Sequence, residues 1–550
     1  MALDKLRHRG PDGFGVVGDA RSAVAMCRLR VRSRRADTVP FAAPDSRTAY
    51  AFNGEVYAIG LDARSPEGGP LKAPQGGLDE AEAVDVQRPT ELDGIYALVR
   101  RTADGSLGLT RDPIGIKPLY LRRDRAGVAV ASEIPALLEL FGPASIRPEA
   151  IAQFLLFGRV VDGGTFFENI EPVAPGARLI LRDGQVRRLA IGPAGSLLAR
   201  PRASVRPARI RAAVIRALDR VLVSDRPLGL ALSGGLDSTI LAAELSSRGM
   251  SDLSTVSVLP RGNGDGVRDL AALALPGTSW RSWRHRSIEF GPNDLLDGIP
   301  DAVRALGEPT AMTSVPMYAA LARLARESGI VVLIIGEGAD EVFCGYRSYL
   351  GLAGATKAAD FYLTAERAAL LRDLVGTQTY EAAQEALAAA LPAPEGRDVG
   401  EVVREFEQEH SLEPLLRRAD HLLMAEGVEG RTPFLHGGLP ALAALLPFGA
   451  LVRGGQTKVP LRQAYAAELP HYVNEVKKPF RAPVDVWLTG HTAPGVRAEL
   501  ARHRERLAGV GLRPAALDSV LDRIAAGDAA VTGVIFPLLT LGAWLEWLTG

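Results

Sequence analysis

The sequence predicts a two-domain protein: a β-sandwich with helices, followed by a doubly wound parallel α/β domain that ends in a mostly helical part. At 550 residues the chain exceeds the size of a single core, so at least two domains are expected. Up to about residue 190 it carries short β-like runs between turn signals, which is typical of packed sheets. From about Ile210 long helical patterns alternate with short apolar strands, the pattern of a parallel sheet.

Short strands dominate the predicted first domain. The runs expected to form them are residues 23–26, 50–52, 94–99, 107–109, 118–121, 128–131 and 177–181. Turn-forming residues separate them, which favours a sandwich of sheets. A stretch rich in Gly, Pro and Arg follows at residues 191–207 and predicts a linker, so the two domains are expected at residues 1–190 and 208–550.

The strands of the second domain are predicted from wholly apolar runs. These runs cover residues 228–232, 253–259 and 331–335, with helical patterns between them. Strands that are buried on both faces have continuous apolar sequences, so a parallel sheet with helices on both sides is expected. Ligands bind such sheets beyond the carboxyl ends of the strands. After about Leu350 we expect mostly helix.

Composition argues against several classes of function. Lys+Arg and Asp+Glu are equal at 64 each, so bulk charge gives no indication of nucleic acid or an anionic membrane as a partner. Two cysteines, Cys27 and Cys344, cannot build a disulfide framework, and with a charged start that predicts no secretory signal they favour the cytoplasm. The most apolar stretch, residues 529–545, contains two glycines and a proline, and is expected to be a core helix rather than a membrane span.

A glycine turn follows the first predicted strand of the second domain. Residues 233–238 read Ser-Gly-Gly-Leu-Asp-Ser, between an apolar run and a helical pattern. Such a turn directs backbone N–H groups and the positive end of a helix at one point, which suits a phosphate or pyrophosphate. Asp237 would hold a magnesium ion on the same phosphates. The weaker alternative is an ordinary strand–helix turn.

An acidic loop follows the strand predicted at residues 331–335. It reads Gly-Glu-Gly-Ala-Asp-Glu and places Glu337, Asp340 and Glu341 within five residues. These carboxylates repel one another unless a positive charge is present, and magnesium on a nucleotide or a substrate ammonium would supply it. The alternative is a solvated acidic helix start, favoured by the helix dipole. Asp237 in the glycine turn favours the nucleotide site.

These motifs resemble those of the glutamine-dependent asparagine synthetases and their relatives. Residues 233–238 are similar to the pyrophosphate loop of that family and residues 336–341 to its second acidic loop. Further similar segments follow in the expected order at residues 316–318, 420–425, 429–435, 457–462, 469–470 and 477–480. At the front, residues 7–13, 52–57, 92–94 and 111–120 resemble the class II glutaminase domain of the family. The resemblance covers nearly the whole chain.

The resemblance implies an ATP-dependent, amide-forming ligase in the second domain, of the ATP-pyrophosphatase type. A carboxylate, with the aspartate side chain as the leading acceptor, would be adenylated with ATP and Mg²⁺, and ammonia would displace AMP. Asp237 and Asp340 match magnesium-linked positions, and Glu337 matches a substrate-side carboxylate. Lys477 matches the lysine that stabilises phosphate charge, with Lys478 as its neighbouring candidate. The implied ATP contacts are Leu232, Ser233, Gly234, Gly235, Asp237, Ser238, Val258 and Gly336.

The same resemblance implies glutamine binding in the first domain. Asn53 and Gly54 match oxyanion-hole positions, while Arg28 and Glu55 match glutamine contacts, Arg28 by a bidentate grip on the α-carboxylate. Taken alone, Asn-Gly would predict a hairpin turn. The implied partners are the small molecules ATP, a carboxylate acceptor, and glutamine or ammonia, and the family suggests a homodimer.

The chain departs from the family at its start. The glutaminase nucleophile of the family is a cysteine directly after the initiator methionine, whereas position 2 here is Ala2 and the internal Cys27 is expected to be a core residue. Either the true start lies upstream, or glutamine hydrolysis has been lost and ammonia or another amine is used. The chain as given is not expected to hydrolyse glutamine.

Two further departures concern the ligands. Residues 61–90 offer only Asp79 as a weak match for the aspartate that holds the glutamine ammonium, and His436 stands where the family usually has an aspartate. In the family this position is expected to lie near the acceptor carboxylate, so a specialised relative that amidates or cyclises another carboxylate remains the alternative. A catalytically silent homologue would have eroded phosphate motifs, and these are intact.

Overall fold

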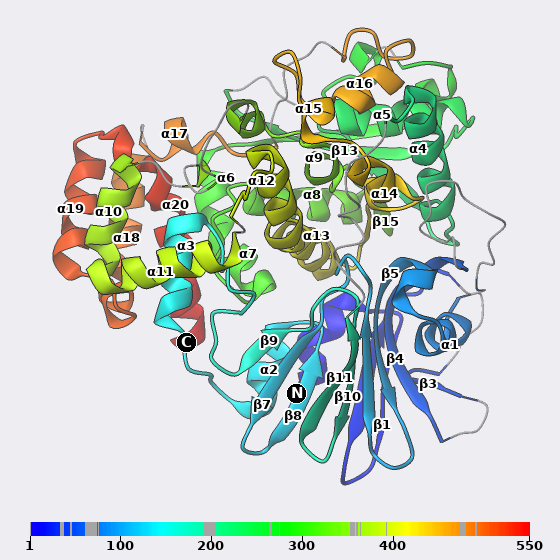
Figure 1. The fold of residues 1–550 in the computed structure, drawn as a ribbon, viewed down its shortest axis with the longest axis horizontal. Helices are drawn as coiled ribbons and strands as arrows, with labels where there is room; N and C mark the ends of the chain where they lie inside the picture. Colours follow the sequence, from blue (N-terminus) through cyan, green and yellow to red (C-terminus); the bar gives the residue numbers. More distant parts are fainter. Residues whose placement is uncertain are drawn as a thin grey trace.

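The computed structural model describes residues 2–32, 38–43, 47–60, 74, 76–191, 204–262, 267–273, 275–352, 358, 361–362, 365–391, 393–473, 480–489 and 492–549. A β-rich part and an α/β part lie side by side, and a group of helices flanks the α/β part (Figure 1). The predicted class, sheets first and a parallel α/β domain second, is confirmed. The division at residues 190 and 208 stays a prediction, because β11 ends at Ile191, α4 begins at Pro207 and residues 192–203 lie outside the described residues.

The described strands of the first part form three sheets. One is an antiparallel six-stranded sheet in the order β11-β10-β6-β5-β4-β3, and the others are the pair β1-β2 and the sheet β8-β7-β9. The strands are β1 (Gly13–Gly18), β2 (Ala23–Arg28), β3 (Phe41–Ala42), β4 (Ala49–Ile59), β5 (Leu92–Arg101), β6 (Leu107–Arg111), β7 (Tyr120–Asp124), β8 (Gly127–Ala131), β9 (Ile170–Pro172), β10 (Ala177–Arg182) and β11 (Gln185–Ile191).

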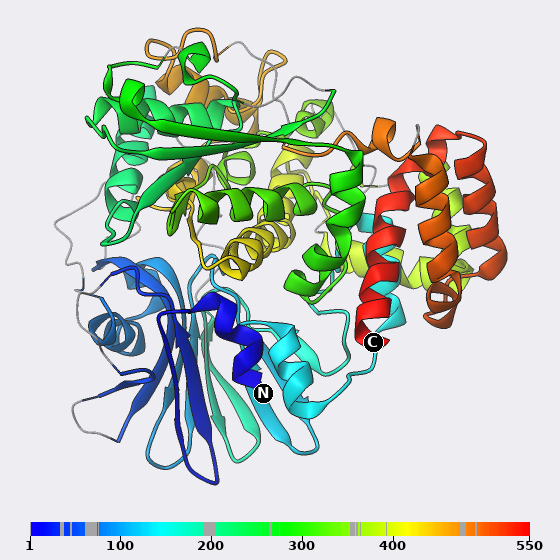
Figure 2. The ribbon, with the colours of Figure 1, turned by 180° about the vertical axis from the view of Figure 1, so that it is seen from behind.

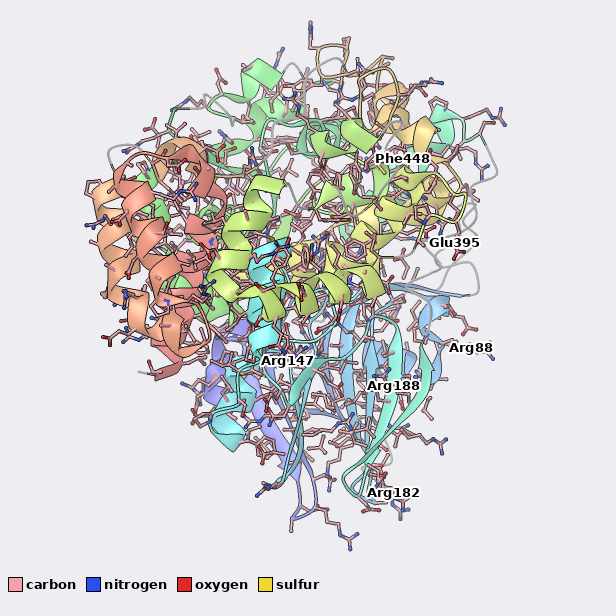
Figure 3. All side chains as sticks on the ribbon, turned by 60° about the vertical axis from the view of Figure 1, so that its left-hand side comes forward. Arg88, Arg147, Arg182, Arg188, Glu395 and Phe448 are labelled. Atoms are coloured by element: carbon pink, nitrogen blue, oxygen red, sulfur yellow. The ribbon has the colours of Figure 1, made fainter. Side chains whose placement is uncertain are left out.

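Helices cover this part only sparsely. They are η1 (Ala2–Arg9), α1 (Leu78–Val86), η2 (Pro89–Glu91), α2 (Ile134–Phe141) and α3 (Pro148–Phe157). The helix η1 lies beside α2 (Figure 2). Exposed arginines, among them Arg88, Arg182 and Arg188, project from the outer surface of the sandwich (Figure 3).

A five-stranded parallel sheet is the centre of the second part. Its order is β14-β13-β12-β15-β16, with β12 (Leu228–Ala231), β13 (Ser254–Pro260), β14 (Arg284–Phe290), β15 (Val332–Ile334) and β16 (Glu429–Arg431). The strand order reverses between β12 and β15, because β12 leads outward to β13 and β15 leads outward to β16. In open parallel sheets such a reversal opens a crevice at the carboxyl ends of the two strands.

Helices pack around this sheet and extend beyond it. They are α4 (Pro207–Val221), α5 (Leu236–Ser247), η4 (Leu270–Leu273), η5 (Ser279–Ser282), α6 (Pro292–Asp297), α7 (Ile299–Leu306), α8 (Val315–Glu327), α9 (Ala339–Phe343), η6 (Arg347–Leu352), α10 (Ala365–Val375), α11 (Thr377–Ala390), α12 (Val399–His410), α13 (Leu412–Ala425), η8 (Pro433–Leu435), α14 (Leu439–Ala444), α15 (Phe448–Leu451), α16 (Val459–Ala464), α17 (Val484–Trp487), α18 (Ala493–Gly509), α19 (Pro514–Ala525), η9 (Ala529–Val531) and α20 (Thr532–Thr549).

The apolar C-terminal helix α20 belongs to the core, as expected. Among the described residues it is the one helix long and apolar enough to cross a membrane, yet 72% of it is buried inside the protein. Trp544 is fully buried and donates a hydrogen bond to the carbonyl of Gly307. The helix α3 from the first part of the chain packs against α20 and α11, among the C-terminal helices (Figure 1).

Candidate active site

The glycine turn lies at the carboxyl end of β12. Gly234 has a φ of +76°, a conformation that glycine adopts without strain, and Gly235 caps the start of α5. The hydroxyl of Ser238 accepts a hydrogen bond from the amide of Ser233 over 3.3 Å and donates one to the carbonyl of Gly235 over 3.2 Å. The two serines that frame the glycines therefore fix the shape of the turn.

The acidic loop lies at the carboxyl end of β15, directly beside that turn. A Cβ atom added to Gly336 would approach Cβ of Asp237 to 3.2 Å, so the two loops are in close contact at this glycine. Gly338 has a φ of +89°, and a Cβ atom at this position would lie only 2.5 Å from side-chain atoms of Leu435. The loops that carry Asp237 and Asp340 are thus brought together, as the sequence predicts.

A buried lysine joins the two loops. The ammonium of Lys458 lies 2.6 Å from Oδ2 of Asp237 and 2.7 Å from Oδ1 of Asp340, and the side chain is 2% exposed. Its backbone has a φ of +54°, which a non-glycine residue adopts only at a cost. Such strain at a residue that places a charge between two carboxylates points to a functional position.

Gly345 makes room for this lysine. A Cβ atom at Gly345 would lie 2.0 Å from Cε of Lys458 and 1.9 Å from Oδ1 of Asp340. The hydroxyl of Thr457 donates a hydrogen bond to the Gly345 carbonyl over 3.1 Å, which holds the two segments together.

Sequence reasoning missed Lys458. It noted residues 457–462 only as a similar segment and assigned the phosphate-binding role to Lys477, which with Lys478 lies outside the described residues. A signal was present, because lysine occurs only at positions 5, 72, 117, 357, 458, 477 and 478, and Lys458 is one of four that fall in segments that resemble the family.

A cavity of about 100 Å³ opens between the two strand tips. Its lining includes eight of the sequence-predicted residues: Leu232, Ser233, Asp237, Ser238, Val258, Gly336, Glu337 and Asp340. Gly234 and Gly235 lie in the adjoining turn and are not part of the lining. The other lining side chains are mostly apolar and include Tyr318, Leu321 and Phe480.

The remaining acidic groups also have partners within the protein. The carboxylate of Glu337 pairs with Arg418 of α13, whose guanidinium also donates to the hydroxyl of Ser314 over 2.6 Å. Burial, together with the charges of Asp340 and Glu337, raises the pKa of Glu341 to about 7. The repulsion predicted for the acidic loop is therefore offset by Lys458 and Arg418.

The two carboxylates at the strand tips fit a magnesium ion that arrives on a nucleotide. Asp237 and Asp340 both contact the ammonium of Lys458, so the space between the two carboxylates favours a cation. Among the described residues no group of three or more potential ligands could hold a metal by itself. Magnesium in nucleotide sites is held by one or two carboxylates together with phosphate oxygens and water, and Asp237 and Asp340 would supply the carboxylates.

A second cavity, of about 460 Å³, lies in the first part of the chain. Its walls include residues of β2, β4, β5 and β8. The four residues predicted to bind glutamine, Arg28, Asn53, Gly54 and Glu55, all contribute to its lining. Asn53 and Gly54 lie within β4, so the hairpin alternative is wrong.

The carboxylates of this cavity are paired with arginines. Glu55 accepts a hydrogen bond from Arg431 of β16 over 2.7 Å, and Arg32 donates to Glu80 over 3.1 Å. Burial raises the pKa of Glu80 to about 7. The lining includes Glu80 and not Asp79, the weak match chosen from the sequence.

Two expectations about single residues are wrong. Cys27 is only partly buried and contributes to the lining of the N-terminal cavity, so it is not a core side chain, and burial raises the pKa of its thiol. His436 does not line the cavity at the strand tips. Its Nδ1 lies 2.7 Å from Oδ1 of Asp93 on β5, so it belongs to the contact between the two parts.

The helix α13 connects the two cavities. Arg418 contacts Glu337 at the strand tips, whereas Met424, six residues later, lines the N-terminal cavity. Between them Asp420 is held by Arg9 over 2.6 Å and by Lys117 over 3.0 Å. Although burial opposes it, these two cations lower the pKa of Asp420 below its usual range. About 9 Å of helix therefore separates a contact of one cavity from the wall of the other.

Comparison with protein families agrees with this architecture. A family described as asparagine synthase matches residues 209–546, and one described as a glutamine amidotransferase domain matches residues 1–61 and 82–190. The interval at residues 62–81 falls within the segment 61–90 that departs from the family pattern.

Several curated proteins are similar to the chain. It is 25% identical to asparagine synthetase [glutamine-hydrolyzing] 1 of Bacillus subtilis (strain 168), with 89% of this chain and 84% of that protein covered. It is 26% identical to a putative asparagine synthetase [glutamine-hydrolyzing] of Mycobacterium tuberculosis (strain ATCC 25618 / H37Rv), with 88% of this chain and 83% of that protein covered. It is 28% identical to asparagine synthetase B [glutamine-hydrolyzing] of Escherichia coli (strain K12), with 62% of this chain and 60% of that protein covered.

Among solved structures, a glutamine phosphoribosylpyrophosphate amidotransferase from B. subtilis is 15% identical and covers 61% of this chain and 78% of its own. Its TM-score is 0.23, at which the two chains superpose poorly as a whole.

Proposed function

The chain belongs to the asparagine synthase family, and on that premise we propose that it activates a carboxylate with ATP at the tips of β12 and β15 and converts it to an amide with ammonia. A carboxylate resists nucleophiles because of its charge. Attack of its oxygen on the α-phosphorus forms the acyl–phosphate bond and releases pyrophosphate. Ammonia then attacks the acyl carbon, AMP leaves with the bonding electrons, and one proton is released.

Residues that line the cavity, together with Lys458 and the glycine turn beside it, supply the parts that this reaction needs. Backbone N–H groups of the turn at residues 233–235 would bind the pyrophosphate oxygens, and the ammonium of Lys458 would offset their developing charge. The bound magnesium would neutralise phosphate charge as a Lewis acid, held by Asp237 and Asp340. Glu337 would face the acceptor, and the backbones of Leu232, Val258 and Gly336 would contact adenine and ribose. Lys477 stays a candidate for a second phosphate contact.

The single observation that carries the proposal is the position of Lys458. A buried ammonium within 2.7 Å of carboxylates from two different strand tips, beside a glycine turn, is an arrangement suited to phosphate chemistry. A strand–helix turn with no ligand would give no reason for the strained backbone of that lysine.

We propose the side chain of aspartate as the acceptor. The ion pair of Glu337 with Arg418 places one charge of each sign beside the cavity. The α-ammonium and α-carboxylate of an amino acid can exchange with such a pair. The similar proteins of B. subtilis and E. coli are named asparagine synthetases, and this supports the same acceptor.

Glutamine is the proposed source of ammonia in a form of the protein that carries a nucleophilic cysteine. A second candidate is a specialised relative that uses another carboxylate and takes ammonia or an amine from solution. One observation favours it: two carboxylates of the lining, Glu55, which is itself a predicted glutamine contact, and Glu80, are ion-paired with Arg431 and Arg32. Paired carboxylates are less available to an incoming ammonium group.

Exchange of labelled pyrophosphate into ATP tests the proposal, since it requires adenylation but not ammonia. We expect exchange that depends on an added acid, with aspartate as the best acid for the first candidate and another acid for the second. Exchange should be lost in Asp237→Ala and in Lys458→Met. Lys477→Ala tests the candidate outside the described residues. Asp518→Asn serves as the control, because Asp518 is a half-buried carboxylate that pairs with Arg504 and does not line the cavity. Absence of exchange with every acid would refute the function.

A further inference from the structure

We infer that Lys458 is a tethered counter-ion that holds the position of the metal until a nucleotide arrives, so that a divalent ion binds this site only together with phosphates. The inference rests on the proposed function, because it needs a nucleotide at the strand tips. It goes beyond that function by assigning a second role to the lysine in the nucleotide-free enzyme.

The geometry of the carboxylates leads to this role. Asp237 and Asp340 come from loops far apart in the sequence and would repel each other across a buried space. The ammonium contacts one oxygen of each, at 2.6 and 2.7 Å. It therefore occupies a point between the two carboxylates, which is where an ion that bridges them would lie.

The lysine is built into this place. Its side chain is 2% exposed, its backbone has a positive φ, and Gly345 provides the space that its Cε needs. The ammonium is therefore already present before any ligand binds. A divalent ion from solution would have to enter beside a fixed positive charge and take over its two partners, which like-charge repulsion opposes.

A nucleotide changes this balance. Phosphate oxygens give the ammonium new acceptors, and the flexible stem of lysine lets its head group move to them. The oxygens that the ammonium contacted, one of each carboxylate, can then bind the ion that the phosphates carry. The physical consequence is positive coupling between metal and nucleotide: each is expected to bind poorly alone and well together.

The consequence can be measured with Mn²⁺ as the probe, by the loss of the electron paramagnetic resonance signal of free Mn²⁺ on titration with the full-length protein. For the wild type we expect no binding at this site without nucleotide. With an ATP analogue whose α,β-bridge cannot be cleaved, we expect a signal loss beyond that caused by the analogue in a protein-free titration. In Lys458→Met, nucleotide-free binding should become tighter by about ten-fold or more.

Lys117→Met is the matched control. Lys117 is also a buried lysine paired with an aspartate, but its partner is Asp420, at the contact between the two parts, whereas Lys458 pairs with Asp237 and Asp340. The substitution Lys117→Met removes the same charge but leaves the contacts of Lys458 with Asp237 and Asp340 in place. Mn²⁺ binding should therefore stay as in the wild type. Equal tightening in both variants would show a general charge effect and overturn the inference.

Wild-type protein alone also decides the matter if Lys458→Met does not fold. Mg²⁺ without nucleotide should leave the melting temperature unchanged, and Mg²⁺ with the analogue should raise it. Strong Mn²⁺ binding to nucleotide-free wild type, competed by Mg²⁺, would overturn the inference while leaving the proposed function intact. Failure of the analogue to bind under any condition would instead refute the proposed function itself.

Discussion

Arg431 and Glu55 join the parallel sheet to the sandwich through one buried contact. Nη2 of the arginine, on β16, donates to Oε2 of the glutamate, on β4, over 2.7 Å, and both side chains are almost fully buried. The same guanidinium donates from Nη1 to the carbonyls of Val221 and Val223. A residue assigned to glutamine binding from sequence thus also connects the two parts of the molecule.

Breaking this contact should destabilise the protein. In Glu55→Gln the charge of Arg431 would lose its nearest carboxylate partner in a buried place, and we expect a loss of about 3–5 kcal/mol in the free energy of unfolding. Urea titration followed by circular dichroism measures it. In the control Asp301→Asn, which removes an exposed pair with Arg304, the loss should stay below about 1 kcal/mol. Equal losses would show that the buried pair contributes no more to the free energy of unfolding than the exposed pair does.

Adding one methyl group at Gly345 should disturb the candidate active site. In Gly345→Ala the new Cβ would overlap Cε of Lys458 and a carboxylate oxygen of Asp340, so one of them must move. We expect pyrophosphate exchange to fall by an order of magnitude or more, and stability to fall by about 1–3 kcal/mol. Gly351→Ala is the control, because a Cβ atom there meets nothing within 4 Å. Unchanged exchange in Gly345→Ala would contradict the placement of Lys458.

Acid should weaken the contact between the two parts through His421. Burial lowers the pKa of this imidazole to about 4, against 6.5 for an exposed histidine. Between these values the unfolded chain binds more protons than the folded one, so stability falls as the pH drops from about 6.5 towards 4. The contribution, about 3 kcal/mol, is fully present above pH 6.5.

A variant separates this effect from others. Glu80 and Glu341 have raised pKa values of about 7, so their contributions fall as the pH rises from about 4.5 to 7, which opposes the trend of His421. We therefore compare wild type with His421→Phe by urea titration at pH 7.5 and pH 5. Their difference in stability should change by about 2 kcal/mol in favour of the variant at the lower pH. A constant difference would mean that His421 does not titrate in this range.

Ammonium should support amide formation by the chain as given, whereas glutamine should not. The only cysteine in the lining of the N-terminal cavity, Cys27, is internal and has a thiol of raised pKa, so it is a poor nucleophile. Formation of the amide from aspartate, ATP and either nitrogen source can be followed by chromatography of the amino acids. Release of glutamate from glutamine at a rate that matches amide formation would contradict this expectation.

Local patterns predicted the fold class because each part has a strong periodicity. The apolar runs at residues 228–232 and 331–335 became neighbouring parallel strands, and the loops after them meet as expected. Lys458 could not be placed in this way. It reaches Asp237 over 221 positions in the chain, and nothing in its local sequence states which loop it will approach.

The predictions for His436 and Asp79 failed for the same reason, because both positions depend on tertiary packing. His436 follows a segment that resembles the acceptor region, yet its side chain pairs with Asp93 of the first part, a contact that depends on how the two parts pack. The pairing of Glu80 rather than Asp79 with the cavity depends on the rotation of one short helix, α1, which sequence alone leaves open.

The packing of α3 should prevent the two parts of the chain from being prepared as separate stable fragments. A cut in the interval 192–203 would leave α3 attached to the sandwich and withdraw it from α11 and α20, uncovering apolar surface on both fragments. Neither half-molecule should therefore stay monomeric on its own. Co-expression of the two pieces, rather than their separate preparation, should therefore be needed to keep the apolar surfaces of both covered.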